Sequence, residues 1–192
     1  GDLALFAELV RSRDRRRILE YATRCIEGVY NFATLHRTGP VTMALVSGSA
    51  LGGGFEVALA CNQVVVERHA KLGFPELSFN LFPGMGALTF VSLRAGPRAC
   101  ADLVTSGRNV SAEEALSLGL VDAIAEPGQI ESTARELMQR RRPSLDAYRT
   151  FLRARDRTPL GVRYEELLAV TEVWVDAACA LEAKDLEVMD RL

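Results

Sequence analysis

Apolar residues between Leu19 and Phe32 recur three or four positions apart along the chain. This spacing places them on one side of a helix, so the pattern predicts a helical segment with one buried face over residues 3–35. The polar run at residues 12–14 predicts a break in that segment. Gly39, which precedes a proline, predicts its end.

Short apolar runs dominate the middle of the chain, where we expect buried strands of a parallel sheet. The runs lie at residues 41–46, 64–66, 71–74 and 121–125. Helical patterns are predicted at residues 55–61 and 84–93, separated by an irregular stretch at 75–83. Strands that alternate with helices in this way are typical of an α/β core.

Helical patterns continue from Pro127 to the end of the chain. The predicted pieces cover residues 130–140, 144–155 and 164–192. The expected organisation is therefore an α/β core at residues 1–126 and an α-helical extension at residues 127–192.

Length and charge limit the possible partners. The chain has 192 residues, 48% of them hydrophobic, and a net charge of −2, which fits one globular domain with a sizeable core. A charge this small creates no general attraction to nucleic acid or to a membrane surface. No apolar run approaches the roughly 20 residues that cross a bilayer, and no signal peptide opens the sequence. These features predict a cytoplasmic protein with neither kind of partner.

The cysteines and histidines show no metal-ligand spacing. We expect buried free thiols, because each cysteine has apolar neighbours and none forms a C-x-x-C pair. The four are Cys25, Cys61, Cys100 and Cys179. Both histidines, His36 and His69, have polar neighbours and are expected at the surface. No metal site is predicted.

Arginines gather at residues 11–17 and again at residues 140–142. Such runs are typical of solvated helix faces, and a docking patch for an acidic regulatory partner is the alternative.

The segment from Leu51 to Glu56 has the strongest chemical signal. Three glycines between a predicted strand and a helix let a ligand approach the backbone closely. The start of the helix offers unpaired N–H groups to an oxyanion, and Glu56 lies in its first turn. A tight turn with Glu56 as a helix-terminus charge explains the same residues without chemistry. The segment lacks the Gly-Lys-Ser/Thr ending of a phosphate-binding loop.

A second carboxylate follows 20 residues later. Glu76 comes directly after Pro75 on predicted loop, and a glycine turn at residues 82–87 opens the next helix with Met85. Two carboxylates beside an oxyanion site would suit proton transfer next to a thioester carbonyl. Taken alone, Glu76 is better explained as an exposed loop residue.

In order and spacing, residues 50–56, 74–76, 82–86 and 112–122 resemble the signatures of the crotonase (enoyl-CoA hydratase/isomerase) superfamily. The resemblance implies a spiral core of repeated ββα units that lacks its first strands here. It also implies that Glu56 and Glu76 are the acid/base pair and that Gly53 and Gly1 donate the oxyanion N–H groups. Because many members lack one glutamate, both together imply hydration or dehydration.

Substrate contacts and partners are implied by the same resemblance. Leu51, Gly52, Met85 and Trp174 would contact the substrate, an acyl-CoA or acyl carrier protein thioester, and no separate cofactor is needed. Members commonly form trimers or hexamers, which residues 127–192 would support while covering the acyl pocket. Trp174 lies on an apolar helical stripe that favours core or oligomer packing, with the pocket lining as the alternative.

Phe55 and the segments at residues 1–6, 81–87, 171–176 and 189–192 are further similar to the bacterial diffusible signal factor synthases, a branch of this superfamily. That similarity implies dehydration of a 3-hydroxyacyl carrier-protein thioester to the cis-2-enoyl form, followed by hydrolysis to a fatty-acid signal used in quorum sensing. The alternatives are a general enoyl-CoA hydratase/isomerase of fatty-acid metabolism and a non-catalytic module that binds acyl thioesters. Two glutamates argue against the module, because binding alone requires neither.

The N-terminus departs from the family pattern. Relatives carry roughly a further third of chain before Gly1, and the amide of Gly1 could serve the oxyanion only as part of a longer polypeptide. We therefore expect residues upstream of Gly1 in the physical protein.

Overall fold

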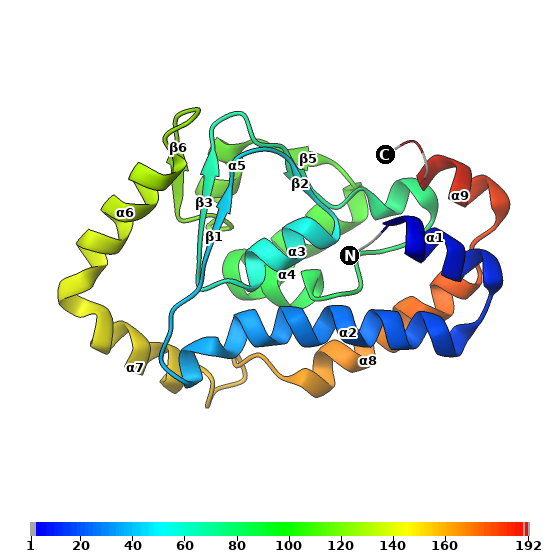
Figure 1. Ribbon diagram of the computed structural model, residues 1–192, viewed down its shortest axis with the longest axis horizontal. Coiled ribbons are helices and arrows are strands. Elements are labelled where there is room, and N and C mark those ends of the chain that lie inside the picture. The colour runs from blue at the N-terminus through cyan, green and yellow to red at the C-terminus, as the bar shows by residue number, and fades with distance from the viewer. Residues whose placement is uncertain (1–2, 190, 192) are drawn as a thin grey trace.

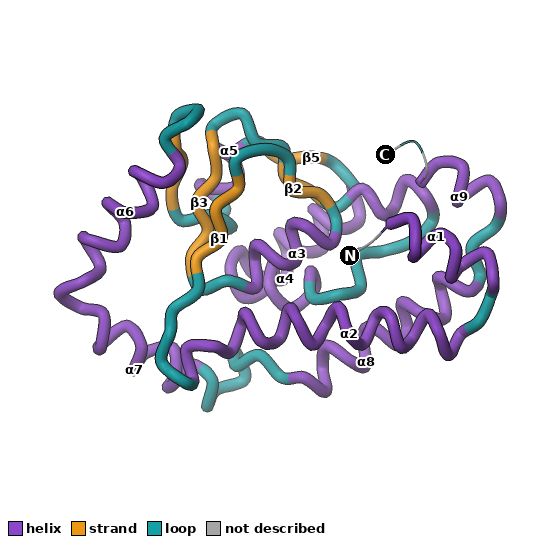
Figure 2. Tube along the Cα trace, viewed as in Figure 1, coloured by secondary structure: helices purple, strands orange, loops and turns teal. Residues whose placement is uncertain are grey.

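The computed structural model describes residues 3–189 and 191, which fold into helices around two small sheets (Figures 1 and 2). The α-helices are α1 (Leu3–Ser12), α2 (Arg15–Thr34), α3 (Gly53–Ala60), α4 (Ala87–Ser106), α5 (Ala112–Ser117), α6 (Ile130–Arg141), α7 (Leu145–Arg155), α8 (Tyr164–Cys179) and α9 (Ala183–Met189). The strands are β1 (Met43–Val46), β2 (Ala50–Leu51), β3 (Gln63–Glu67), β4 (Leu72–Gly73), β5 (Asn109–Val110) and β6 (Ala123–Ala125). Three short 3₁₀ helices are η1 (Leu35–Arg37), η2 (Pro75–Phe79) and η3 (Arg142–Ser144).

The larger sheet is parallel, with strand order β1-β3-β6. Every residue of its central strand β3 is buried, which explains why the three residues at its centre, 64–66, are all valine rather than alternating apolar and polar. Met43 pairs with Gln63 and Val65 with Ala123. The predicted parallel strands at residues 41–46, 64–66 and 121–125 are confirmed.

The smaller sheet, in the order β2-β4-β5, positions the chemistry. Strand β2 pairs in parallel with β4, so Leu51 lies opposite Gly73. The chain leaves β2 directly into α3 and leaves β4 directly into η2. Two paired strands thus deliver the start of α3 and the start of η2 to the same edge of the sheet.

Helices α2 and α8 run side by side along one edge of the molecule (Figure 1). Their apolar faces contribute to two buried clusters. One surrounds α3 and α4, and the other joins α1 to α8 and α9. The predicted break of the first helix is confirmed, because Arg13 adopts φ 51° and the Asp14 carboxylate caps α2 by accepting the Arg17 N–H at 3.1 Å.

The prediction of one helix over residues 164–192 is wrong. Helix α8 ends at Cys179, and α9 begins at Ala183. The Asp185 carboxylate accepts the N–H of Glu182 at 2.8 Å, so a side-chain cap starts a separate helix there. Likewise, the stretch 75–83 contains η2, which Pro75 opens with its preset φ.

The surface position predicted for His36 is also wrong. Its side chain is buried, and its Nε2 lies 2.9 Å from Oδ2 of Asp156, which also accepts a hydrogen bond from Arg37 at 2.7 Å. A polar neighbourhood in sequence gave no hint of this partner, which lies 120 residues away. His69 is half exposed, as predicted.

Helices that could cross a bilayer do not occur among residues 3–189 and 191. In the same part of the chain, no group of three or more His, Cys, Asp or Glu side chains could hold a metal ion. The four cysteines are free thiols, but only Cys61 and Cys100 are buried.

Candidate active site

A cavity of about 280 Å³ lies where α3, η2 and the loop before α4 meet α1, α8 and α9. It is lined by Phe6, Tyr21, Leu51, Gly52, Gly53, Gly54, Glu56, Pro75, Glu76, Phe79, Leu81, Gly84, Met85, Trp174 and Met189. Every predicted site residue except Gly1 is among them. Gly1 lies outside the described residues.

The start of α3 forms one wall of this cavity. Gly52 precedes the helix with a positive φ of 53°, a backbone conformation that residues other than glycine rarely adopt. Its carbonyl accepts the N–H groups of Phe55 and Glu56, so the N–H groups of Gly53 and Gly54 have no intrahelical acceptor. These two donors therefore lie at the positive end of the helix dipole.

Glu56 is 1% exposed, although it carries a carboxylate. Its Oε1 accepts two backbone hydrogen bonds, from the Met85 N–H at 2.8 Å and from the Ala87 N–H at 2.9 Å. Burial nevertheless dominates and raises the pKa of Glu56 to about 7, while the two N–H donors oppose the rise. Glu56 can therefore hold or release a proton near neutral pH.

Glu76 approaches the same cavity from η2. Its Oε2 is buried without a hydrogen-bond partner in the described part of the chain. Burial, and then the neighbouring Glu56 carboxylate, raise the pKa of Glu76 to about 8. A Cβ on Gly52 would clash with Glu76 Oε1, so a larger residue at this position would displace the carboxyl.

An apolar wall faces the two carboxyls. Trp174 of α8 is buried and stacks against Phe6 of α1, with ring centroids 5.0 Å apart. Sequence reasoning did not assign Phe6, Tyr21 or Met189 to the site. These residues come together because the last helices of the chain, α8 and α9, pack against the first, and no local sequence pattern predicts that packing.

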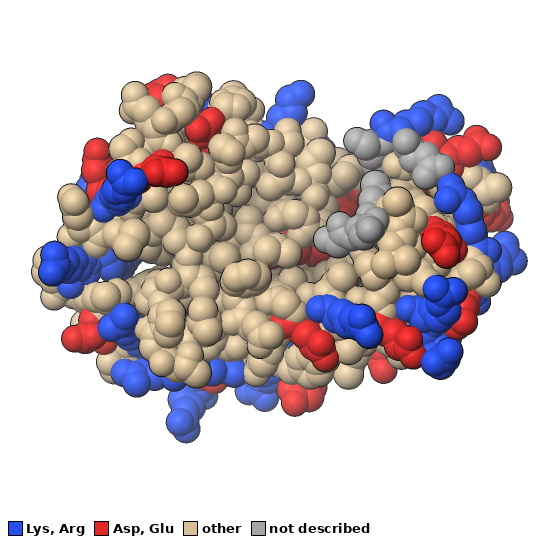
Figure 3. Space-filling model, viewed as in Figure 1, with Lys and Arg blue, Asp and Glu red and all other residues tan. Residues whose placement is uncertain are grey.

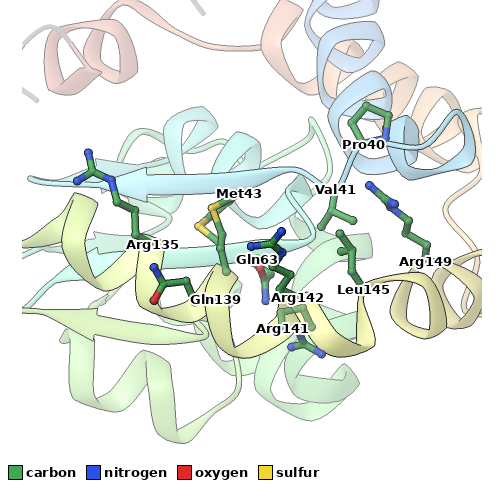
Figure 4. A pocket seen from close by; sticks show the side chains of 11 residues that line it. Pro40, Val41, Met43, Gln63, Arg135, Gln139, Arg141, Arg142, Leu145 and Arg149 are labelled. Atoms are coloured by element: carbon green, nitrogen blue, oxygen red, sulfur yellow. The ribbon is translucent and has the colours of Figure 1, made fainter.

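A second hollow, of about 640 Å³, lies between β1 and the helices α6 and α7 (Figure 4). Its apolar floor includes Val41 and Met43, and its other wall carries the arginines 135, 141, 142 and 149. It holds none of the predicted site residues and no carboxylate. We refer to it below as the arginine hollow.

Arginines elsewhere on the surface alternate with acids (Figure 3). Arg15 binds Asp176 at 2.7 Å, and Arg16 binds Glu20 at 3.0 Å. Local acids thus neutralise part of the arginine run at residues 11–17.

The geometry suits acid–base chemistry. Two buried carboxyls with pKa values near neutrality lie beside unpaired backbone N–H donors and an apolar wall. One carboxyl can accept a proton while the other donates one, and the donors can bind oxygen as negative charge develops on it.

Comparison with known proteins supports this interpretation. The family model for enoyl-CoA hydratase/isomerase matches residues 16–166. The chain is 36% identical over 109 residues to the fatty acid oxidation complex subunit alpha of Pseudomonas syringae pv. tomato, which covers 57% of this chain and 15% of that protein. It is 36% identical over 95 residues to the short-chain-enoyl-CoA hydratase of Clostridium acetobutylicum, covering 50% and 36%.

Solved structures share the fold along the whole chain. The enoyl-CoA hydratase from Bacillus halodurans superposes with a TM-score of 0.77 at 24% identity, covering 100% of this chain and 75% of that one. The crotonase-like fold is therefore confirmed. The chain spans about a third or less of the two curated relatives and three quarters of this structural one.

Proposed function

Since the chain belongs to the enoyl-CoA hydratase/isomerase family, we propose that it adds water to 2-enoyl thioesters, or removes it, in fatty-acid metabolism. The observation that carries the proposal is the buried pair Glu56 and Glu76, whose pKa values are raised to about 7 and about 8, at neutral pH and just above it. A protein that only binds thioesters would gain nothing from burying two carboxyls at the cost of their desolvation.

The two carboxyls are assigned different roles by their surroundings. Two backbone donors stabilise the ionised form of Glu56, so Glu56 is the base that takes a proton from water. Glu76 has no such donor to Oε2 and is the acid. The water oxygen bonds to C3, the C2–C3 π pair moves toward the thioester carbonyl, and Glu76 then gives its proton to C2.

Gly53 completes the step. Its N–H, at the start of α3, would bind the thioester oxygen as negative charge builds up there, and Gly54 offers a second donor on the same turn. The N–H of Gly1 remains a prediction as the second donor to the thioester oxygen. Dehydration of a 3-hydroxyacyl thioester follows the same path in reverse with the two roles exchanged.

The experiment uses the full chain and a series of 2-enoyl-CoA thioesters of increasing length. Loss of the conjugated enoyl absorbance, together with a mass gain of one water, is the expected result. The Glu56→Gln variant is the matched control, since it keeps the shape of the side chain. No product from any acyl length in the unmodified chain would contradict the proposal.

A second candidate is dehydration of a 3-hydroxyacyl carrier-protein thioester followed by hydrolysis to a free cis-2-enoic acid. The favouring observation is that Phe6, Trp174 and Met189 meet in the cavity. Each of these residues comes from a segment that is similar to the signal synthases: residues 1–6, 171–176 and 189–192. The comparisons favour the general hydratase, and mass spectrometry of the carrier-protein reaction distinguishes the two, because only the second candidate releases a free acid.

The substrate would bring its own CoA or phosphopantetheine, so the proposal needs no separate cofactor. Assembly into a trimer or hexamer, a cytoplasmic location and a regulatory partner also stay predictions.

A further inference from the structure

Thr171 of α8 makes a hydrogen bond that is unusual for a threonine inside a helix. Its Oγ1 donates to the carbonyl of Gly84 at 2.9 Å, across 87 residues, and its side chain is fully buried. Helical threonines more often return this bond to the carbonyl four residues earlier. The bond therefore fixes α8 to the loop that precedes α4.

The loop before α4 binds both Thr171 and Glu56 through one peptide group. The carbonyl of Gly84 and the N–H of Met85 belong to one planar peptide group. Thr171 binds its oxygen, and Glu56 Oε1 accepts its N–H at 2.8 Å. A rotation of this peptide would break both bonds together.

Packing holds the peptide from the same helix. A Cβ on Gly84 would lie 2.3 Å from the ring of Trp174, so the Gly84 backbone presses against that ring. Trp174 follows Thr171 by three positions and lies on the same face of α8. One helix face thus positions the peptide twice, by a hydrogen bond and by contact.

We propose that Thr171 is a positioning residue, which orients the Gly84–Met85 peptide and through it the Glu56 carboxylate. A carbonyl that accepts a hydrogen bond polarises its peptide and makes the attached N–H a stronger donor. The Thr171 hydroxyl therefore stabilises the ionised form of Glu56 without touching the substrate. The inference rests on the proposed role of Glu56 as the base.

The chain offers a matched control. Thr89 of α4 also joins α4 to α8, by donating to Glu166 Oε1 at 2.8 Å, and it too is buried. Its bond has no connection to Glu56. Thr171→Val and Thr89→Val each replace one hydroxyl by a methyl group of similar size, whereas Thr171→Ser keeps the hydroxyl.

We expect Thr171→Val to lower kcat about three- to tenfold near neutral pH, with KM little changed, because one neutral hydrogen bond is lost. The limb of the pH–rate profile that reports the base should move to higher pH. Thr171→Ser should restore both values toward those of the unmodified chain, and Thr89→Val should change neither. Among the described residues, Glu76 and Cys25 interact electrostatically with Glu56, and both are unchanged in the threonine variants.

A direct titration separates this inference from the proposed function. Carboxyl carbons labelled with ¹³C in glutamate are followed by NMR against pH, and Glu56→Gln identifies the Glu56 signal. Thr171→Val should raise the pKa of Glu56, whether or not the chain hydrates enoyl thioesters. If the Glu56 titration is the same in Thr171→Val, Thr89→Val and the unmodified chain, Thr171 only packs the helix and the inference is wrong. If the titration shifts but no thioester reacts, the proposed function alone fails.

Discussion

Two hollows of the protein differ in the partners of the charged side chains that line them. The arginine hollow is the more spacious, at about 640 Å³ against about 280 Å³. Three of its arginines have nearby partners: Arg135 binds Glu131 at 2.9 Å, Arg149 binds Asp146 at 3.2 Å, and Arg141 stacks over a tyrosine ring. The Arg135 and Arg149 pairs are open to solvent, where ion pairs contribute little, and the Nε of Arg149 has no hydrogen-bond partner in the described part of the chain.

The smaller cavity shows the opposite arrangement. Glu56 and Glu76 are both buried and line the same cavity, and no cation pairs with either carboxyl in the described part of the chain. This arrangement costs stability and raises the pKa of both groups. Volume is therefore a poor guide to the site, whereas buried groups with displaced pKa values beside free N–H donors are a good one.

The largest expected effect comes from neutralising either carboxyl. Glu56→Gln and Glu76→Gln should each lower kcat about 10²–10⁴-fold, the usual contribution of a positioned acid or base. Steady-state kinetics with a 2-enoyl-CoA and a thermal melt of each variant check this. Near-normal turnover in both variants, with unchanged melting, would remove the carboxyls from the mechanism.

A smaller loss of activity is expected when a side chain at position 52 crowds the Glu76 carboxyl. Gly52→Ala should lower the rate at least tenfold and also destabilise the fold by about 1–2 kcal/mol, because φ 53° is unfavourable for alanine and its Cβ would meet Glu76 Oε1. Gly54→Ala is the control for stability, since a Cβ there has no neighbour within 4 Å. Equal unfolding free energies for the two variants would contradict the tight approach at Gly52.

The pH dependence of stability gives the next test. The pKa of Glu76 rises from 4.5 to about 8 on folding, so the folded state keeps a proton that the unfolded state loses between these values. Stability is therefore lost as the pH rises through this window, and Glu76→Gln should be a few kcal/mol more stable than the unmodified chain at pH 9 but not at pH 4.5. Urea unfolding at both pH values measures it, with exposed Glu8→Gln as the control. The same advantage at both pH values would show that charge is not its source.

The smallest effect should come from the arginine hollow. Arg141→Ala removes the stacking on Tyr148, yet we expect kcat/KM to change by less than about twofold, as for ordinary surface substitutions. A loss above tenfold would make this hollow part of the substrate site and would overturn the comparison.

The sequence predicted the residues at the centre of the cavity better than those of its outer wall. Glu56, Glu76 and the glycines lie on short motifs, and the family resemblance of those motifs implied their roles. Phe6 and Tyr21 entered the cavity only because α1 and α2 pack against the last helices, which no local period reveals.

The errors in the predicted fold also arise from contacts between residues far apart or from single side-chain hydrogen bonds. The boundary between α8 and α9 depends on the cap at Asp185, which interrupts an otherwise helical composition. His36 is buried because Asp156 folds back to meet it. Both features depend on particular hydrogen bonds rather than on periodicity, so periodicity could not show them.

The pH dependence of kcat/KM for the unmodified chain tests most directly whether Glu56 and Glu76 act as the acid and the base. We expect a bell-shaped profile whose limbs, which report the pair as a whole, lie near pH 7 and pH 8. Each Glu→Gln variant should lose the bell shape. A flat profile across neutral pH, or a bell that survives in both variants, would show that the two carboxyls do not share this role.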